Sequence, residues 1–158
     1  MSSIPVNFRR WSHAEGIEIP AYQTAGAAGM DLVCAEPEGE GVLLAPGARA
    51  LIATGFSVEL PKGFEAQVRP RSGLALKHGV TVLNSPGTID CDYRGEIKVL
   101  LVNFGDAPWR ARRGERIAQL VITSVVQAQA VLVESLSDTS RAHGGFGSTG
   151  TNMSSRSA

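Results

Sequence analysis

The sequence predicts an all-β domain with one short helix, and three observations point to it. Glycine (18) and proline (8) recur throughout the 158 residues and divide the chain into short segments. Most of these segments are β-branched or apolar runs bounded by Gly, Pro or Asn, which is typical of strands. Outside one short stretch, no window of ordinary helix length has an apolar face at the helical period. Many short strands with frequent turns favour a β-sandwich or a barrel-like fold.

The strands are predicted from residue patterns. In residues 63–70, GFEAQVRP, apolar residues alternate with Glu, Gln and Arg, which is the period of a half-buried strand. Four further runs predict strands, some of them buried on both faces. They are ARALIATGFSVEL at 48–60, GVTVL at 79–83, GEIKVLLVNF at 95–104 and ERIAQLVITSVV at 115–126.

The one predicted helix lies in PRSGLALKHG, residues 70–79. We expect Ser72 to cap its start and Gly79 to end it. The chain shows no internal repeat and no linker, so we expect one β domain over residues 1–134. Residues 135–158 are polar and glycine-rich, and we expect them to form a C-terminal arm with a disordered tail.

Composition excludes several classes of function. Lys+Arg and Asp+Glu are 15 each, so the chain has no global positive charge to favour stable nucleic acid binding, and anion sites must be local. No apolar run approaches the roughly 20 residues of a membrane span, and MSSIPVNFRRW lacks the apolar core of a signal peptide. Two distant cysteines make a disulfide improbable, so we expect a cytoplasmic location without membrane attachment.

Five segments combine polar residues with glycines. AAGMDL places Asp31 after a turn, where an acid can simply cap the turn. RPRSGLA brings Arg71, Ser72 and Gly73 to the start of the predicted helix, where free N–H groups and two arginines suit an anion. In RRGERIAQL, Gln119 interrupts an apolar strand and needs a polar partner if it is buried.

The densest of these segments is LNSPGTIDCDYRGEIKV, residues 83–99. Two turn sequences, NSPG and YRG, flank Thr88, Ile89 and Asp90, and the segment predicts a hairpin. Its backbone and the Asn84 amide could grip a flat polar ligand. A plain structural hairpin and a metal site at the Asp-x-Asp sequence remain alternatives.

The fifth segment is GFGSTG at residues 145–150, which has the glycine spacing of a dinucleotide-binding loop. That motif requires a preceding strand and a following helix, and the flanking sequence favours neither. A flexible terminus is the plain alternative. An aromatic residue between glycines, with Arg141 upstream, instead favours a phosphate loop of another kind.

In their order and spacing, AGMDL, RPRSGLA, NSPGTIDCDYRGE, RGERIAQL and RAHGGFGSTG resemble the five motifs of the trimeric dUTPases (dUTP pyrophosphatases). The resemblance extends from about Ala28 to Gly150. It implies a distorted jelly-roll (β-clip) subunit, a homotrimer with three active sites at subunit interfaces, and a flexible C-terminal arm. In the family the arm closes over the nucleotide, so Phe146 would stack on uracil and Arg141 would reach the γ-phosphate. Gly147, Ser148 and Thr149 would also bind the substrate, and Ser148 and Thr149 would add hydroxyl and backbone donors.

The resemblance also implies the reaction. dUTP and water would give dUMP, the precursor of thymidylate, and pyrophosphate, which keeps uracil out of DNA. Asp90 would act as the general base for water attack on the α-phosphorus, and Asp31 would hold Mg²⁺ through water. Four residues would bind the phosphates: Arg71, Ser72, Gly73 and Gln119.

Base and sugar selection are expected from the 83–99 segment. By the resemblance, Asn84 and backbone groups between Thr88 and Lys98, including Ile89, would match uracil and reject cytosine, because a mismatch leaves buried polar groups unpaired. Tyr93 would pack under the sugar and leave no space for a 2′-hydroxyl. A dCTP deaminase of the same fold and a non-catalytic nucleotide-binding trimer are the competing hypotheses.

Overall fold

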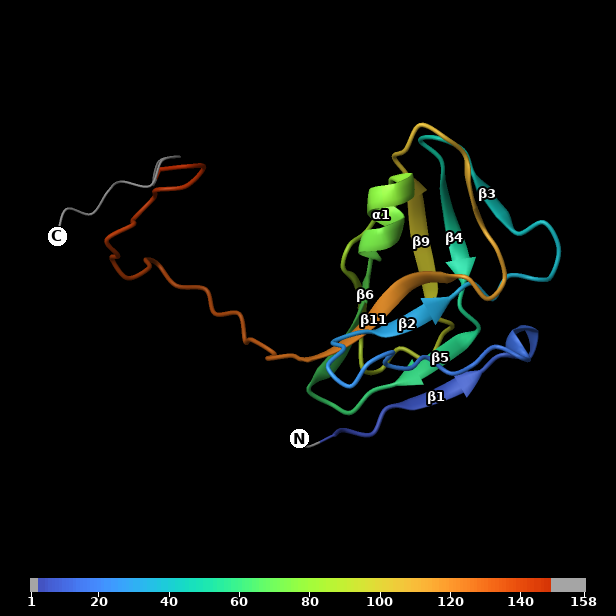
Figure 1. Ribbon diagram of the computed structural model, residues 1–158. Helices are drawn as coiled ribbons and strands as arrows, with labels where there is room; N and C mark the ends of the chain where they lie inside the picture. Colours follow the sequence, from blue (N-terminus) through green and yellow to red (C-terminus); the bar gives the residue numbers. More distant parts are fainter. Residues whose placement is uncertain (1–2, 149–158) are drawn as a thin grey trace. The chain divides into compact units, whose positions relative to one another are not determined.

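The computed structural model describes residues 3–148. They divide into two compact units, one up to Gln127 and one from Ala128 onward, and the expected boundary after residue 134 stays a prediction. All regular elements that the structure describes lie in the first unit (Figure 1). They are β1 (Asn7–Arg10), η1 (a 3-10 helix, Ser12–Ala14), β2 (Met30–Val33), β3 (Val42–Leu44), β4 (Arg49–Ala53), β5 (Phe56–Glu59), β6 (Phe64–Arg69), α1 (Ser72–His78), β7 (Val80–Val82), β8 (Gly87–Ile89), β9 (Lys98–Asn103), β10 (Trp109–Ala111) and β11 (Arg116–Ser124).

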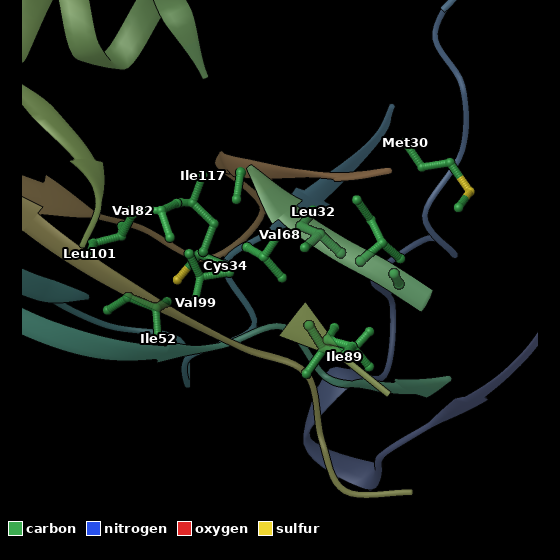
Figure 2. Close-up of a cluster of buried hydrophobic side chains, with 14 of the residues drawn as sticks. Met30, Leu32, Cys34, Ile52, Val68, Val82, Ile89, Val99, Leu101 and Ile117 are labelled. Atoms are coloured by element: carbon green, nitrogen blue, oxygen red, sulfur yellow. The ribbon is translucent and has the colours of Figure 1, made fainter. Parts of the chain in front are cut away.

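The strands form four antiparallel sheets. The larger two have the orders β2-β11-β6-β8 and β4-β9-β7, and the pairs β1-β5 and β10-β3 complete the fold. Apolar side chains from both larger sheets point toward one another and form one core (Figure 2). Ile52 of β4, Leu101 of β9, Leu32 of β2 and Leu120 of β11 are fully buried there. The predicted all-β fold with one short helix is therefore confirmed.

The expected strand run 48–60 is broken into two strands that belong to different sheets. Gly55 causes the break, because its φ of +78° is in the left-handed region that favours glycine. A Cβ at this position would also lie 2.1 Å from the Cβ of Ala14. The turn at Gly55 thus allows η1 to pack closely against the β4–β5 corner.

The helix ends as predicted and begins differently. Gly79 adopts a φ of +66° and its N–H donates to the Ala75 carbonyl at 3.0 Å. The expectation that Ser72 caps the start was wrong. Ser72 is the first helical residue, and Arg71 occupies the capping position without a side-chain capping bond because its guanidinium turns toward Asp31.

The predicted hairpin at residues 83–99 was also wrong in its pairing. β8 pairs with β6, whereas β9 pairs with β4 and β7. The chain changes sheet because Ile97 is bonded to the β4–β5 corner on both sides: its N–H donates to the Phe56 carbonyl at 2.8 Å, and its carbonyl accepts from Thr54 Oγ1 at 2.6 Å. The predicted turn after β8 is present, since Tyr93 N donates to the Asp90 carbonyl at 3.1 Å.

Both cysteines are free thiols, as expected. Burial raises the pKa of the Cys34 thiol, which keeps it protonated within the core. In the part of the chain that is described, no helix has the length and apolar character needed to cross a membrane.

Asn103 is a fully buried polar residue whose side-chain hydrogen bonds join the end of β3 to the β9–β10 turn. Its Nδ2 donates to the Leu44 and Ala107 carbonyls, each at 2.9 Å, and its Oδ1 accepts from Gly105 N at 2.8 Å. We expect Asn103→Ala to lower the free energy of unfolding by about 2–3 kcal/mol, because it leaves buried backbone groups unpaired. Urea denaturation at one protein concentration measures this. Asn7→Ala, which removes an exposed bond to Glu59, is the matched control, and an equal loss in both variants would contradict the assignment.

Candidate active site

A groove of about 640 Å³ lies beside the turn that follows β8. Five residues that the sequence predicted as site residues line it: Thr88, Ile89, Asp90, Tyr93 and Lys98. They are brought together because Ile89 is anchored in the core while Thr88, Asp90 and Lys98 remain exposed. We call this hollow the nucleoside groove.

Tyr93 is held in one orientation by its neighbours. Its hydroxyl donates to the Glu96 carbonyl at 3.1 Å. The ring lies against Gly95, where a Cβ would come within 2.5 Å of Cζ. Only glycine leaves room for this arrangement, so the YRG sequence specifies the position of the ring as well as the turn.

Arg94 stabilises the same turn through hydrogen bonds to its backbone carbonyls. Its guanidinium donates to the Cys91 and Tyr93 carbonyls at 2.7 and 2.9 Å and pairs with Glu59 at 3.1 Å. The hydrogen bond from Asn7, together with the charge of Arg94, holds the pKa of Glu59 below its usual range. Glu59 therefore stays ionised and keeps Arg94 in place.

Sequence reasoning missed five residues of the nucleoside groove. Gly95, Glu96 and Ile97 lie within the predicted segment but were assigned no role. The other two, Trp11 and Leu51, come from distant parts of the chain. No spacing in the sequence relates them to the motif, because Trp11 is placed by its bond to Gly55 and Leu51 by the pairing of β4 with β9.

A second cluster surrounds Asp31 on β2. Its Oδ2 accepts from the Arg116 guanidinium at 3.1 Å, and Arg71 Nε lies 3.5 Å from its Oδ1. Arg71 also donates to the Arg116 carbonyl at 3.0 Å. The Asp31 side chain is only 7% exposed, and the two guanidinium groups offset the free-energy cost of burying its charge. The predicted residues Asp31 and Arg71 are thus in contact, and Arg116 joins them as a residue that the prediction missed.

Gln119 lies beside this cluster. In the β2-β11-β6 ladder it is paired with Asp31 on one side and with Arg69 on the other, so the three side chains share one face of the sheet. Gly29 leaves room for Gln119, because a Cβ there would lie 3.2 Å from the Gln119 Cβ. Gln119 and Arg69 line a groove of about 520 Å³ together with Ser85, which follows the predicted Asn84.

Ser72 and Gly73 are the first two residues of α1, and both are exposed. Their N–H groups have no acceptor within the helix and remain available to an anion. They follow Arg71 directly, so the three residues and the Asp31 cluster form one cationic region. We call this region the phosphate cluster, with Arg116 and Gln119 included.

The nucleoside groove and the phosphate cluster occupy opposite ends of β6. Arg69 at one end pairs with Gln119, whereas β8 runs antiparallel to β6 and passes Ala66 before it reaches Asp90. Four residues of strand separate Arg69 from Glu65, which corresponds to about 13 Å. Within one chain, Asp90 is therefore not brought together with Arg71 and Gln119.

The arm residues belong to the second unit. Arg141 and Phe146 are exposed, Phe146 completely. Two turns shape this segment: Gly144 N donates to the Arg141 carbonyl at 2.9 Å, and Ser148 N donates to the Gly145 carbonyl at 3.0 Å. Gly147 has a φ of +90°. The predicted Thr149 lies outside the described residues.

Ala142 directly follows the arginine of the arm and has a φ of +43°. This left-handed conformation costs an alanine free energy that a glycine does not lose. The arm therefore carries a small local strain next to Arg141.

Among residues 3–148, no three His, Cys, Asp or Glu side chains gather as metal ligands. Asp31 Oδ1 is nevertheless buried and accepts no hydrogen bond from the described residues. A lone carboxylate oxygen of this kind fits a hydrated Mg²⁺, which retains several waters and takes further oxygens from substrate phosphates. The residues present thus suit a water-mediated metal site and not a protein cage.

Comparison with known proteins agrees with this geometry. The family model described as dUTPase matches residues 15–150. A deoxyuridine 5'-triphosphate nucleotidohydrolase of Beijerinckia indica subsp. indica is 63% identical over 142 residues, covering 90% of this chain and 89% of the relative. Its counterpart in Rhizobium rhizogenes is 58% identical over 145 residues, covering 92% of this chain and 93% of the relative.

Solved structures show the same fold. The Staphylococcus bacteriophage 80alpha dUTPase with dUPNHPP superposes with a TM-score of 0.83 at 26% identity, covering 94% of this chain and 100% of the phage chain. A mutant dUTPase from phage phi11 of S. aureus, described with a structural Mg(II) ion, gives a TM-score of 0.75 at 22% identity, covering 85% of this chain and 100% of that chain. With a family model that matches most of its length and relatives at about 60% identity, the chain belongs to the dUTPase family.

Proposed function

We propose that this protein is a dUTP diphosphatase that hydrolyses dUTP to dUMP and pyrophosphate with Mg²⁺. The observation that carries the proposal is the nucleoside groove, in which Thr88, Ile89, Tyr93 and Lys98 line one hollow with Asp90. Asn84, also expected to match uracil, does not line it. Relatives at about 60% identity bear the corresponding enzyme name. We place the enzyme in the cytoplasm, in agreement with its two free thiols.

Recognition of the nucleoside follows from the groove. Backbone groups between Thr88 and Lys98 present a fixed set of donors and acceptors to uracil, and cytosine would leave some of them unpaired. Tyr93, held against Gly95 and bonded to Glu96, forms a rigid wall for deoxyribose. A ribose 2′-hydroxyl would meet this wall, so the same residue selects the sugar.

Asp90 would act as the general base. It is exposed in the groove, where its carboxylate can orient a water and accept its proton as the water attacks the α-phosphorus. The pair Arg71–Arg116, with Ser72 and Gln119, would bind the phosphates and stabilise the charge that develops on the leaving pyrophosphate. Mg²⁺, when bound, supplies further neutralisation of the phosphate charge.

Asp31 would both hold the metal-bound waters and keep Arg71 in place before substrate binds. Arg71 Nε lies 3.5 Å from Asp31 Oδ1. When Arg71 turns to a phosphate, this buried oxygen becomes the acceptor available to a metal-bound water. The same carboxylate therefore serves the apo protein and the complex.

The separation of Asp90 from the phosphate cluster within one chain supports a homotrimer whose active sites are shared between subunits. Asp90 and the phosphate cluster lie toward opposite ends of β6, about 13 Å apart along the strand, so within one chain Asp90 is not next to the groups proposed to bind the phosphates. A symmetric oligomer can place Asp90 of one copy against Arg71 of another. The arm, with Phe146 exposed, would then close over the nucleotide and stack on uracil.

The first test compares dUTP, dCTP, dTTP and UTP with wild-type protein and Mg²⁺. We expect pyrophosphate from dUTP alone, and Asp90→Asn should lower this rate by at least about 100-fold, since it removes the base. Asp106→Asn, an exposed acid in the β9–β10 turn, is the control and should keep full activity. Ammonia released from dCTP would show a deaminase, and dUTP binding without turnover would show a non-catalytic module.

The shared site is tested by mixing subunits. Asp90→Asn and Arg71→Ala proteins should each be inactive, but trimers co-assembled from both should contain one intact site in three. Random 1:1 mixing would then restore about a quarter of wild-type activity. Native mass spectrometry measures the assembly state. If mixed trimers form and remain inactive, both groups come from the same chain.

Phe146→Ala tests the arm. We expect kcat/KM for dUTP to fall about tenfold, the usual consequence of losing one base–aromatic stack. The melting temperature should not change, because Phe146 is fully exposed. Leu136→Ala, another exposed apolar residue of the second unit, is the control. Equal kinetics in both variants would remove Phe146 from the site.

A further inference from the structure

The N-terminal residues Trp11 to His13 lie at the nucleoside groove although they are far from it in sequence. Trp11 lines the groove directly. Its backbone N–H donates to the Gly55 carbonyl and its Nε1 donates to Ser57 Oγ, both at 2.9 Å. The backbone of Trp11 is therefore attached to the β4–β5 corner and its indole to β5, which fixes the ring as part of the groove wall.

His13 contacts the groove through Glu96. Its Nε2 lies 2.8 Å from Glu96 Oε1, and the same oxygen accepts from the Gly55 N–H at 2.8 Å. The Glu96 side chain is only 11% exposed, whereas that of His13 is 37% exposed. Glu96 is thus bound between the β4–β5 corner and the N-terminal segment.

Glu96 also determines where Tyr93 lies. Its carbonyl accepts the Tyr93 hydroxyl at 3.1 Å, and the preceding Gly95 supports the ring. The side chain and the carbonyl of one residue therefore connect His13 to the wall that faces deoxyribose. A continuous path of contacts runs from His13 through Glu96 to Tyr93.

We propose that His13 is a positioning residue for sugar selection, acting through Glu96 on Tyr93, and that Trp11 forms the wall beside it. This rests on the proposed function, since Tyr93 matters for selection only if the groove binds a nucleoside. The contact between His13 and Glu96 lies at the surface on the His13 side, where such a contact adds little to stability. A displacement of the Tyr93 wall by a fraction of an ångström, in contrast, affects how closely a ribose 2′-hydroxyl is excluded.

The test measures kcat and KM for dUTP and UTP in His13 variants. We expect His13→Ala to raise the KM for dUTP about three- to tenfold, with a smaller change in kcat and a lower dUTP/UTP ratio of kcat/KM. His13→Gln should retain wild-type selectivity, because its amide nitrogen can occupy the place of Nε2. His78→Ala, the same change at an exposed histidine on α1, is the control. His13→Ser replaces His13→Ala if the alanine variant has a lower melting temperature.

The path through Tyr93 is tested by a double variant. In a Tyr93→Ala background, where the wall is absent, His13→Ala should cause no further loss of selectivity. Additive losses would overturn the path, and an unchanged dUTP/UTP ratio in His13→Ala and His13→Ser would overturn the proposal. Wild-type turnover of dUTP is measured in the same series, so failure of the enzyme assignment is distinguished from failure of this inference.

Discussion

The antiparallel pairing of β6 with β11 on one side and β8 on the other is the interaction on which the site depends. It places Gln119 opposite Arg69 at one end of β6 and leads β8 into Asp90 at the other. Leu120 and Val68 hold this register, since both are buried in the core and face each other in the ladder. A slip by one residue would move Gln119 into the core and expose Leu120. The packing of Leu120 and Val68 in the core therefore also determines that Gln119 and Arg69 lie on the opposite, polar face of the sheet.

Asp31 is the second constraint. A carboxylate that is 7% exposed is stable in its ionised form only beside positive charge, and it holds Arg71 and Arg116 together before any nucleotide binds. Cations that are already in position lose less conformational freedom when a phosphate arrives. Under the proposed function, the burial of Asp31 would thus preorganise the two arginines for phosphate binding, and preorganised charges of this kind are the usual source of electrostatic catalysis.

The fold class and most strands could be predicted from sequence, because alternation in β6 and bounded apolar runs elsewhere are local signals. The path of the chain after Asp90 could not be predicted from sequence. It depends on hydrogen bonds between Ile97 and the distant β4–β5 corner, which leave no local pattern. For the same reason Trp11 was missed, whereas Thr88 and Tyr93 were found within a contiguous motif. The separation of Asp90 from Arg71 was equally hidden, since order along the chain says nothing of which end of a strand a residue reaches.

The sequence motifs thus form two separate clusters within one chain, the nucleoside groove and the phosphate cluster. Tyr93 and Glu96 line the nucleoside groove of a single chain, and His13 of the same chain contacts Glu96. In the proposed homotrimer, a second copy would bring its Asp90 to the groups proposed to bind the phosphates. Under the proposed function, base and sugar selection is a property of the subunit, and hydrolysis is a property of the assembly. This division fits the proposal that His13 and Glu96 act on sugar selection without contacting the phosphate cluster.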